Sequence, residues 1–120
     1  MANVLVVDDD EYIREMSRAF IEILGHSAVT ASNGKEAETA LQTGKFDVVL
    51  TDLELPGMSG WEIAKMVKAS SQKARVGLIS GHDTGLSKQA LLDKGVDFVL
   101  GKPFSMSGLE DILSGSPAKK

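Results

Sequence analysis

Residues 4–10 have the sequence VLVVDDD, four apolar residues followed directly by three aspartates. Four consecutive apolar residues, three of them valine, predict a strand that is covered on both faces, as in a parallel sheet. The aspartates end the strand, and Asp10 can cap a helix that is predicted over residues 11–24. The start of the chain therefore predicts a strand–helix unit with carboxylates at its junction.

The same order of strand and helix continues along the whole sequence. The predicted strands cover residues 4–7, 28–31, 46–51, 76–80 and 97–100, and the predicted helices cover residues 11–24, 35–43, 60–69, 84–94 and 106–113. Strands that alternate with helices through short connections predict right-handed crossovers and a parallel sheet. The fold class is therefore α/β, with a doubly wound parallel five-stranded sheet in a single domain.

The composition excludes several classes of protein. The 120 residues contain no cysteine and two histidines, which excludes disulfide frameworks, thiol catalysis and cysteine- or histidine-rich zinc sites. The net charge of −4 argues against direct binding to nucleic acid. No apolar run approaches the ~20 residues of a membrane span, and residues 1–3 show no signal peptide. A cytoplasmic protein without a membrane partner is expected.

Polar side chains follow the predicted strands where each strand ends. Asp8 and Asp9 follow the first strand, Asp52 the third, Ser80 ends the fourth, and Lys102 lies just after the fifth. In a doubly wound sheet, functional sites form outside the carboxyl ends of the strands. Each residue alone has an ordinary structural explanation, such as a turn, a cap or a solvated lysine. Their coincidence on one edge instead predicts a site.

The chemistry of this predicted site follows from its residue types. Clustered carboxylates repel one another unless a cation neutralises them. Donors that are all oxygen favour Mg²⁺. A lysine and a hydroxyl can hold phosphoryl oxygens, and a central carboxylate can act as a nucleophile that forms an acyl phosphate.

Four segments together resemble the receiver domain of two-component response regulators. They are residues 4–11 (VLVVDDDE), 48–60 (VVLTDLELPGMSG), 78–81 (LISG) and 102–104 (KPF). The resemblance implies a flavodoxin-like (βα)₅ fold over residues 3–113, with residues 114–120 as a loose tail. It also implies a histidine kinase or phosphotransfer protein as the partner that donates the phosphoryl group.

The resemblance assigns a role to each candidate residue. Asp52 is the expected phosphoacceptor, Lys102 the phosphoryl-binding lysine and Ser80 the switch hydroxyl. The expected Mg²⁺ ligands are Asp9, Asp52 and the main-chain carbonyl of Glu54, with Asp8 acting through water. Gly81 resembles the small residue that leaves the site open, and Pro103 the proline of a Lys–Pro peptide that is often cis.

The sequence departs from the family pattern at Val99, where many receivers have an aromatic switch residue. Phe98 is adjacent, but alternation along a strand turns it to the opposite face of the sheet. Receivers attached to hybrid histidine kinases more often lack this aromatic residue. The chain is therefore expected to be part of a larger hybrid kinase or a single-domain regulator.

Two rival interpretations remain open at this point. A small aspartyl-phosphate phosphohydrolase would also use Asp and Mg²⁺, and Glu54 has the spacing of its acid/base residue, but no segment could form a cap domain. A degenerate receiver could serve only as a binding surface, which the complete acidic set and Lys102 argue against. The chain is accordingly expected not to be an enzyme. Of the remaining residues, His26 and His82 are expected on the surface and Trp61 in helix packing.

Overall fold

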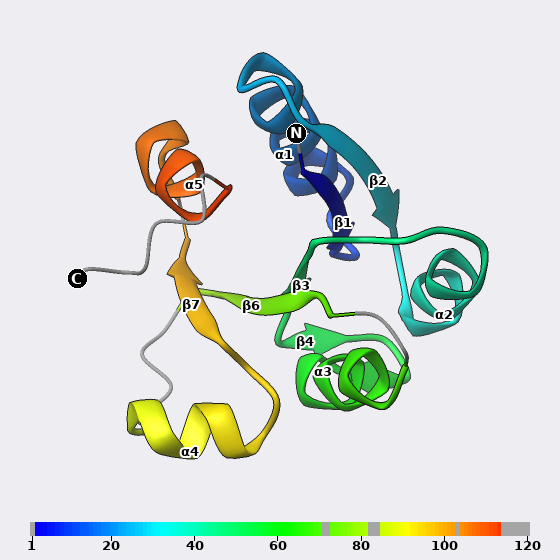
Figure 1. Cartoon of the computed structure of the whole chain (residues 1–120), viewed down its shortest axis with the longest axis vertical. Helices are drawn as coiled ribbons and strands as arrows, with labels where there is room; N and C mark the ends of the chain where they lie inside the picture. Colours follow the sequence, from blue (N-terminus) through cyan, green and yellow to red (C-terminus); the bar gives the residue numbers. More distant parts are fainter. Residues whose placement is uncertain (1, 71–72, 82–84, 103, 114–120) are drawn as a thin grey trace.

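The structure is a computed structural model that describes residues 2–70, 73–81, 85–102 and 104–113. Its strands are β1 (Asn3–Val7), β2 (Ser27–Ala31), β3 (Val48–Asp52), β4 (Glu54–Leu55), β5 (Met58–Ser59), β6 (Arg75–Ser80) and β7 (Phe98–Gly101). Its helices are α1 (Glu11–Ile23), α2 (Gly34–Thr43), α3 (Gly60–Ala69), α4 (Lys88–Asp93) and α5 (Met106–Leu113). Five parallel strands form the main sheet in the order β2-β1-β3-β6-β7, which confirms the predicted doubly wound sheet (Figure 1).

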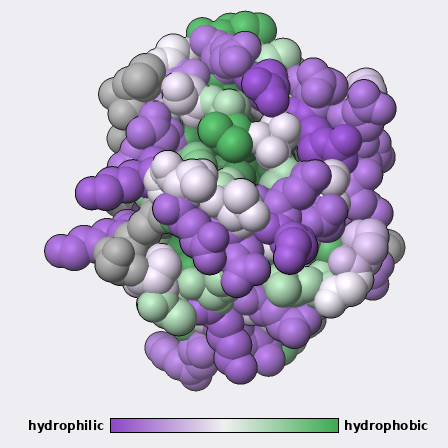
Figure 2. Space-filling model, turned by 90° about the vertical axis from the view of Figure 1, so that its right-hand side faces the viewer, coloured by the Kyte–Doolittle hydropathy of each residue, from purple (hydrophilic) through white to green (hydrophobic). Residues whose placement is uncertain are grey.

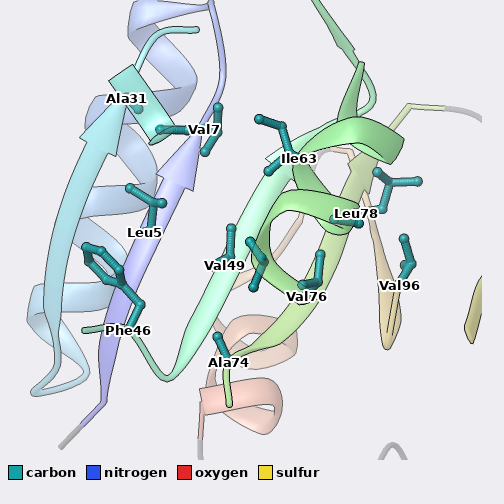
Figure 3. Packing of buried hydrophobic residues seen from close by; sticks show 13 residues of the cluster. Leu5, Val7, Ala31, Phe46, Val49, Ile63, Ala74, Val76, Leu78 and Val96 are labelled. Carbon is teal, nitrogen blue, oxygen red and sulfur yellow. The ribbon is translucent and has the colours of Figure 1, made fainter. Parts of the chain in front are cut away.

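Helices cover both faces of this sheet, because side chains along each strand point alternately to opposite faces. On one face, strand residues pack against α2 and α3. Figure 3 shows part of this cluster, with Ile63 of α3 beside Val49 and Leu78 of the strands. On the other face they pack against α1 and α5. The first cluster includes Leu5, Val49, Ile63, Val67 and Leu78, and the second includes Val6, Ile21, Leu50, Leu109 and Leu113. Burial of each large side chain contributes about 2 kcal/mol, so these two clusters hold the strand ends in place.

The helix that follows β1 and the helix that follows the β3–β5 segment are both capped by side chains. The carboxylate of Asp10 accepts a hydrogen bond from the Tyr12 amide (2.9 Å), as the sequence predicts. Ser59 and Glu62 form a reciprocal capping box at the start of α3, with bonds of 3.3 and 2.9 Å. Such caps satisfy amides that have no partner inside the helix, and they fix where each helix starts.

The prediction of a helix over residues 84–94 is wrong at its beginning. α4 starts at Lys88, where the Ser87 hydroxyl accepts a hydrogen bond from the Ala90 amide (3.1 Å). Gly85 has a φ of +72°, a left-handed conformation that cannot belong to a right-handed helix. The resulting helix has six residues and buries none of them.

The segment between β3 and α3 is also more ordered than the loop that the sequence predicts. β4 and β5 form an antiparallel ribbon in which Glu54 pairs with Ser59 and Leu55 with Met58. Gly57 has a φ of +76° in the connecting turn. Strands of two residues are too short to show alternation in the sequence, so this ribbon could not be predicted.

Three predictions about single residues have different outcomes. Trp61 packs against the α2/α3 core as predicted, and the Lys94 ammonium lies 5.2 Å from its ring centroid. His26, expected on the surface, is partly exposed, and its Nδ1 accepts a hydrogen bond from the Ala2 amide (2.8 Å). His82 and the predicted tail over residues 114–120 lie outside the described residues.

Phe98 and Val99 point to opposite faces of β7, as predicted. Phe98 packs with the α1/α5 cluster, whereas Val99 is on the α4 side and 39% exposed. The Phe98 ring occupies the space above Gly77, its pairing partner in β6, and the Arg75 guanidinium lies 5.8 Å from the ring centroid. Because Gly77 has no side chain, it leaves the space that the Phe98 ring occupies.

Gly77→Ala is expected to destabilise the protein by about 2 kcal/mol, because overpacking a filled site forces side chains away. A Cβ at residue 77 would lie 2.0–2.8 Å from three ring carbons of Phe98. Gly101→Ala is the matched control, since a Cβ there would meet no neighbour within 4 Å. Denaturant unfolding of the two variants measures the difference. Equal stability of the two would show that the Phe98 ring is free to leave Gly77.

The surface has no extended apolar area on the face shown in Figure 2, where hydrophilic residues surround small separate hydrophobic patches. The exposed large hydrophobic residues of the described chain lie at the two ends of α1 (Tyr12 and Ile23) and on β2, α4 and β7 (Val29, Leu92 and Val99). None of the helices in the described part of the chain has the length and apolar character to cross a membrane.

Candidate functional site

The carboxyl ends of β1 and β3 meet where the strand order reverses, since the chain goes from β1 to β2 on one side and returns to β3 on the other. Asp8 and Asp9 directly follow β1, and Asp52 is the last residue of β3. One carboxylate oxygen from each of the three lies within 4.8 Å of the others. The predicted gathering of carboxylates at this edge is confirmed.

Asp8 is the most buried member of the cluster, with no exposed surface. Its Oδ1 accepts a hydrogen bond from the Asp10 amide (2.9 Å), while its buried Oδ2 has no hydrogen-bond partner among the described residues. Burial raises the pKa of the Asp8 carboxyl; the Asp10 amide opposes this rise and the charge of Asp52 adds to it, so that the pKa lies above its usual value. The charged form of Asp8 therefore carries an energetic cost in the isolated chain.

Lys102 is the cation that faces this cluster. Its Nζ lies 3.3 Å from Asp8 Oδ2 and 3.5 Å from Asp52 Oδ1. Burial lowers the pKa of Lys102, but the carboxylates of Asp8 and Asp52 together raise it by more, so the net shift is upward. One ammonium beside three carboxylates leaves an excess of negative charge that a divalent cation would neutralise.

The structure also brings Ser80 to this edge. Ser80 ends β6, is 8% exposed, and its carbonyl accepts a hydrogen bond from the Lys102 amide (2.8 Å). Gly81 follows and is exposed, and a Cβ at that position would contact nothing within 4 Å. Glu54 lies two residues beyond Asp52 with an exposed side chain. Pro103 lies outside the described residues.

Two residues at the site could not be recognised from the sequence. The Arg14 guanidinium donates a hydrogen bond to the carbonyl of Asp8 (2.9 Å). Gly60 lies so close to the main chain after β3 that a Cβ would be 2.5 Å from the Asp52 carbonyl oxygen and 2.9 Å from Leu53 Cα. The Ser59–Gly60 pair at the start of α3 is typical of a helix start, but nothing in the sequence shows which main-chain segment lies against it.

The comparisons with known proteins agree with this geometry. The sequence profile described as the response regulator receiver domain matches residues 4–114. The chain belongs to the response regulator receiver domain family. Receiver domains are the phosphoacceptor domains of two-component signalling, and this receiver is thus a signalling domain.

Individual relatives cover this receiver almost completely. The response regulator MprA of Mycolicibacterium vanbaalenii is 31% identical over 92% of the chain, which spans 47% of MprA. The crystallised chemotaxis protein CheY4 of Vibrio cholerae is 32% identical, with a TM-score of 0.88 over 96% of this chain and 98% of that one. TrrA of Thermotoga maritima, solved in complex with Mg²⁺-BeF, is 30% identical, with a TM-score of 0.84 over 96% and 98% of the two chains.

Receiver domains bind Mg²⁺ in an acidic pocket, and the residues of this receiver fit such an ion. All three carboxylates offer oxygen ligands, which Mg²⁺ prefers. The buried Asp8 Oδ2 makes no hydrogen bond within the described residues, and the Lys102 ammonium lies 3.3 Å from it. The donor set and this oxygen both favour a hydrated cation between Asp8, Asp9 and Asp52.

Without Mg²⁺ at pH 7, Asp8→Asn is expected to raise the free energy of unfolding by about 1 kcal/mol, because it removes a buried charge. The pKa of Asp8 is higher in the folded than in the unfolded chain, so the wild type loses stability as pH rises through the folded pKa. The gain from Asp8→Asn should therefore shrink as pH falls toward 4. Asp10→Asn, which keeps a helix cap, is the control in thermal unfolding. A gain that does not depend on pH would contradict the assignment to the Asp8 charge.

Proposed function

We propose that Asp52 is the residue of this receiver that accepts the phosphoryl group. The observation that carries the proposal is that Lys102 Nζ lies within 3.5 Å of a carboxylate oxygen of both Asp8 and Asp52. A lysine in this position can pair with the phosphoryl oxygens on the side of Asp52 opposite a metal ion. Asp52 is also only 16% exposed in its side chain, yet it stands at the open end of the sheet.

Each residue of the site has its own role in the proposed phosphoryl transfer. An Asp52 carboxylate oxygen attacks the phosphorus of the donor, a P–O bond forms, and the bond from phosphorus to the leaving group breaks with its electron pair. Bound Mg²⁺ supplies positive charge for the phosphoryl oxygens. The proposed ligands are Asp9, Asp52 and the main-chain carbonyl of Glu54, with Asp8 reached through water. Lys102 balances the remaining negative charge.

The response to phosphorylation is proposed to run through Ser80, whose hydroxyl would move toward the phosphoryl group on Asp52. Val99 offers no aromatic ring for a second switch. Phe98 is confined above Gly77, which supports a mechanism in which its ring keeps one orientation. Structures with and without a phosphoryl mimic would test this, since a reoriented Phe98 ring would contradict it.

The proposed donor is a histidine kinase or a phosphotransfer protein, the partners with which receiver domains interact. The chain spans less than half the length of the MprA regulators that it resembles, so the activities of those whole proteins are not assigned to this chain. A single-domain regulator and a receiver within a larger hybrid kinase both remain compatible with the proposal. A cytoplasmic location is part of the proposal.

The test is incubation of the whole chain with a small acyl phosphate, with Mg²⁺ or with a chelator. Intact-mass measurement should show one added phosphoryl group per chain that needs Mg²⁺ and is removed by hydroxylamine. A phosphohydrolase would instead release phosphate over many turnovers on soluble phosphomonoesters. Rapid turnover of that kind, or an absence of any adduct with Mg²⁺, would overturn the proposed function.

A further inference from the structure

The turn between β1 and α1 is held by a side chain that the proposed chemistry does not use. The pairing of β1 with β3 ends at Val7 and Thr51, so the Asp8 carbonyl lies beyond the last paired residues of these strands. The Asp8 amide still donates to the Ala31 carbonyl (3.1 Å). On the other side of the residue, the Asp8 carbonyl accepts a hydrogen bond from Nη1 of Arg14 (2.9 Å).

This hydrogen bond controls the direction of the next residue. A peptide unit is planar, so fixing the Asp8 carbonyl also fixes the plane that contains the Asp9 nitrogen. The Asp8 side chain is already held by the Asp10 amide. With both held, the main-chain position from which the Asp9 carboxylate extends is largely set before any ion binds.

The main chain of Arg14 is fixed in α1, and its guanidinium has a weak electrostatic attraction to Glu36. Its amide donates to the Asp10 carbonyl within the first turn of α1 (3.1 Å). Its guanidinium lies close enough to Glu36 of α2 to contribute to the lowered pKa of that carboxyl, which the amide and hydroxyl of Ser32 lower more strongly. The residue that donates to the Asp8 carbonyl is therefore anchored by its main chain in the first turn of α1.

We propose that Arg14 is a positioning residue for Mg²⁺, acting through the Asp8–Asp9 peptide rather than by touching the ion. The inference rests on the proposed function, because it concerns the same carboxylates. Groups that orient metal ligands typically contribute 10- to 100-fold to metal affinity. Arg14 is therefore expected to set how tightly the acidic cluster binds Mg²⁺, in addition to stabilising the turn.

The test is Mg²⁺ binding by the folded chain, measured by calorimetric titration well below the melting temperature. Arg14→Met should weaken Mg²⁺ binding by about 10-fold. Arg18→Met is the matched control, because Arg18 lies one turn later on α1 and donates to the Thr30 hydroxyl (3.1 Å), away from the β1–α1 turn. This control should bind Mg²⁺ within about 2-fold of the wild type. Arg14→Lys, which keeps the charge and one possible donor, should fall between the two and serves if Arg14→Met does not fold.

A second readout separates positioning from a general structural role. Phosphorylation of Arg14→Met by a small acyl phosphate should be slow at limiting Mg²⁺ and should recover to near the wild-type rate at saturating Mg²⁺. Wild-type Mg²⁺ affinity in Arg14→Met, or slow phosphorylation that saturating Mg²⁺ does not restore, would overturn the inference alone. Failure of the wild type to bind Mg²⁺ or to be phosphorylated would instead overturn the proposed function on which it rests.

Discussion

In Asp52→Asn, phosphorylation by a small acyl phosphate is expected to fall at least about 100-fold, because a carboxamide cannot form the acyl phosphate. Asp52 is the last residue of β3, and one of its carboxylate oxygens is 3.5 Å from Lys102 Nζ. No other carboxylate should replace it at full stoichiometry, since Asp8 is completely buried and the Lys102 ammonium forms ion pairs with Asp8 and Asp52 but not with Asp9 in the described structure. Intact mass after reaction measures the loss.

The control for this experiment is available at the other end of the same strand. Asp47 directly precedes β3, is exposed, and accepts a hydrogen bond from the Asn3 amide (2.8 Å). Asp47→Asn makes the same chemical change about five residues away from the site, and it should leave phosphorylation at the wild-type level. An adduct of unchanged stoichiometry in Asp52→Asn would mean that the phosphoryl group is carried elsewhere.

Lys102→Met is expected to destabilise the folded chain strongly when no metal is present. Removal of the ammonium leaves the fully buried Asp8 carboxylate without the cation that lies 3.3 Å away. Breaking a buried ion pair from one side costs about 3–5 kcal/mol, and the 27% exposure of the Lys102 side chain reduces the expected loss to about 2 kcal/mol. Because its pKa is raised, the stabilisation by Lys102 is complete at neutral pH and is lost only as pH rises through the folded pKa.

Added Mg²⁺ and a second substitution at Asp8 make the prediction for Lys102→Met specific. Mg²⁺ should stabilise Lys102→Met more than the wild type, since the ion supplies the positive charge that the variant lacks. Addition of Asp8→Asn should recover most of the loss without metal. Lys68→Met is the control, because it breaks the ion pair with Asp97 (2.8 Å) away from the acidic site and should not respond to Mg²⁺. The assignment fails if Mg²⁺ stabilises both lysine variants equally.

The part of the site that the sequence predicted is the part determined by strand ends. Each of Asp8, Asp52 and Ser80 follows or ends a run of apolar residues, and parallel strands bring such ends to one edge of the sheet. The same local signals predicted the cap at Asp10. These predictions needed only the period of the apolar residues and the preferences of capping residues.

The remaining features depend on contacts between distant segments. Nothing near Gly77 in the sequence reveals the Phe98 ring that fills its place, because the two residues meet only through the pairing of β6 with β7. The hydrogen bond from Arg14 to the Asp8 carbonyl depends on a side-chain orientation that polar or apolar character does not specify. The predicted start of the helix over residues 84–94 was wrong because the sequence does not show that Gly85 adopts a left-handed conformation and that the helix is capped by Ser87.

The short length of α4 has a consequence for where this receiver unfolds locally. Its six residues include no buried side chain, and glycines in a left-handed conformation, Gly85 and Gly95, lie on either side of it. Segments with few buried contacts unfold locally at a low free-energy cost and exchange their amide hydrogens first. α4 should thus lose amide protection before the other described helices. Because little free energy is needed to deform α4, even a small displacement at the end of β6 should change the rate of amide hydrogen exchange in this helix.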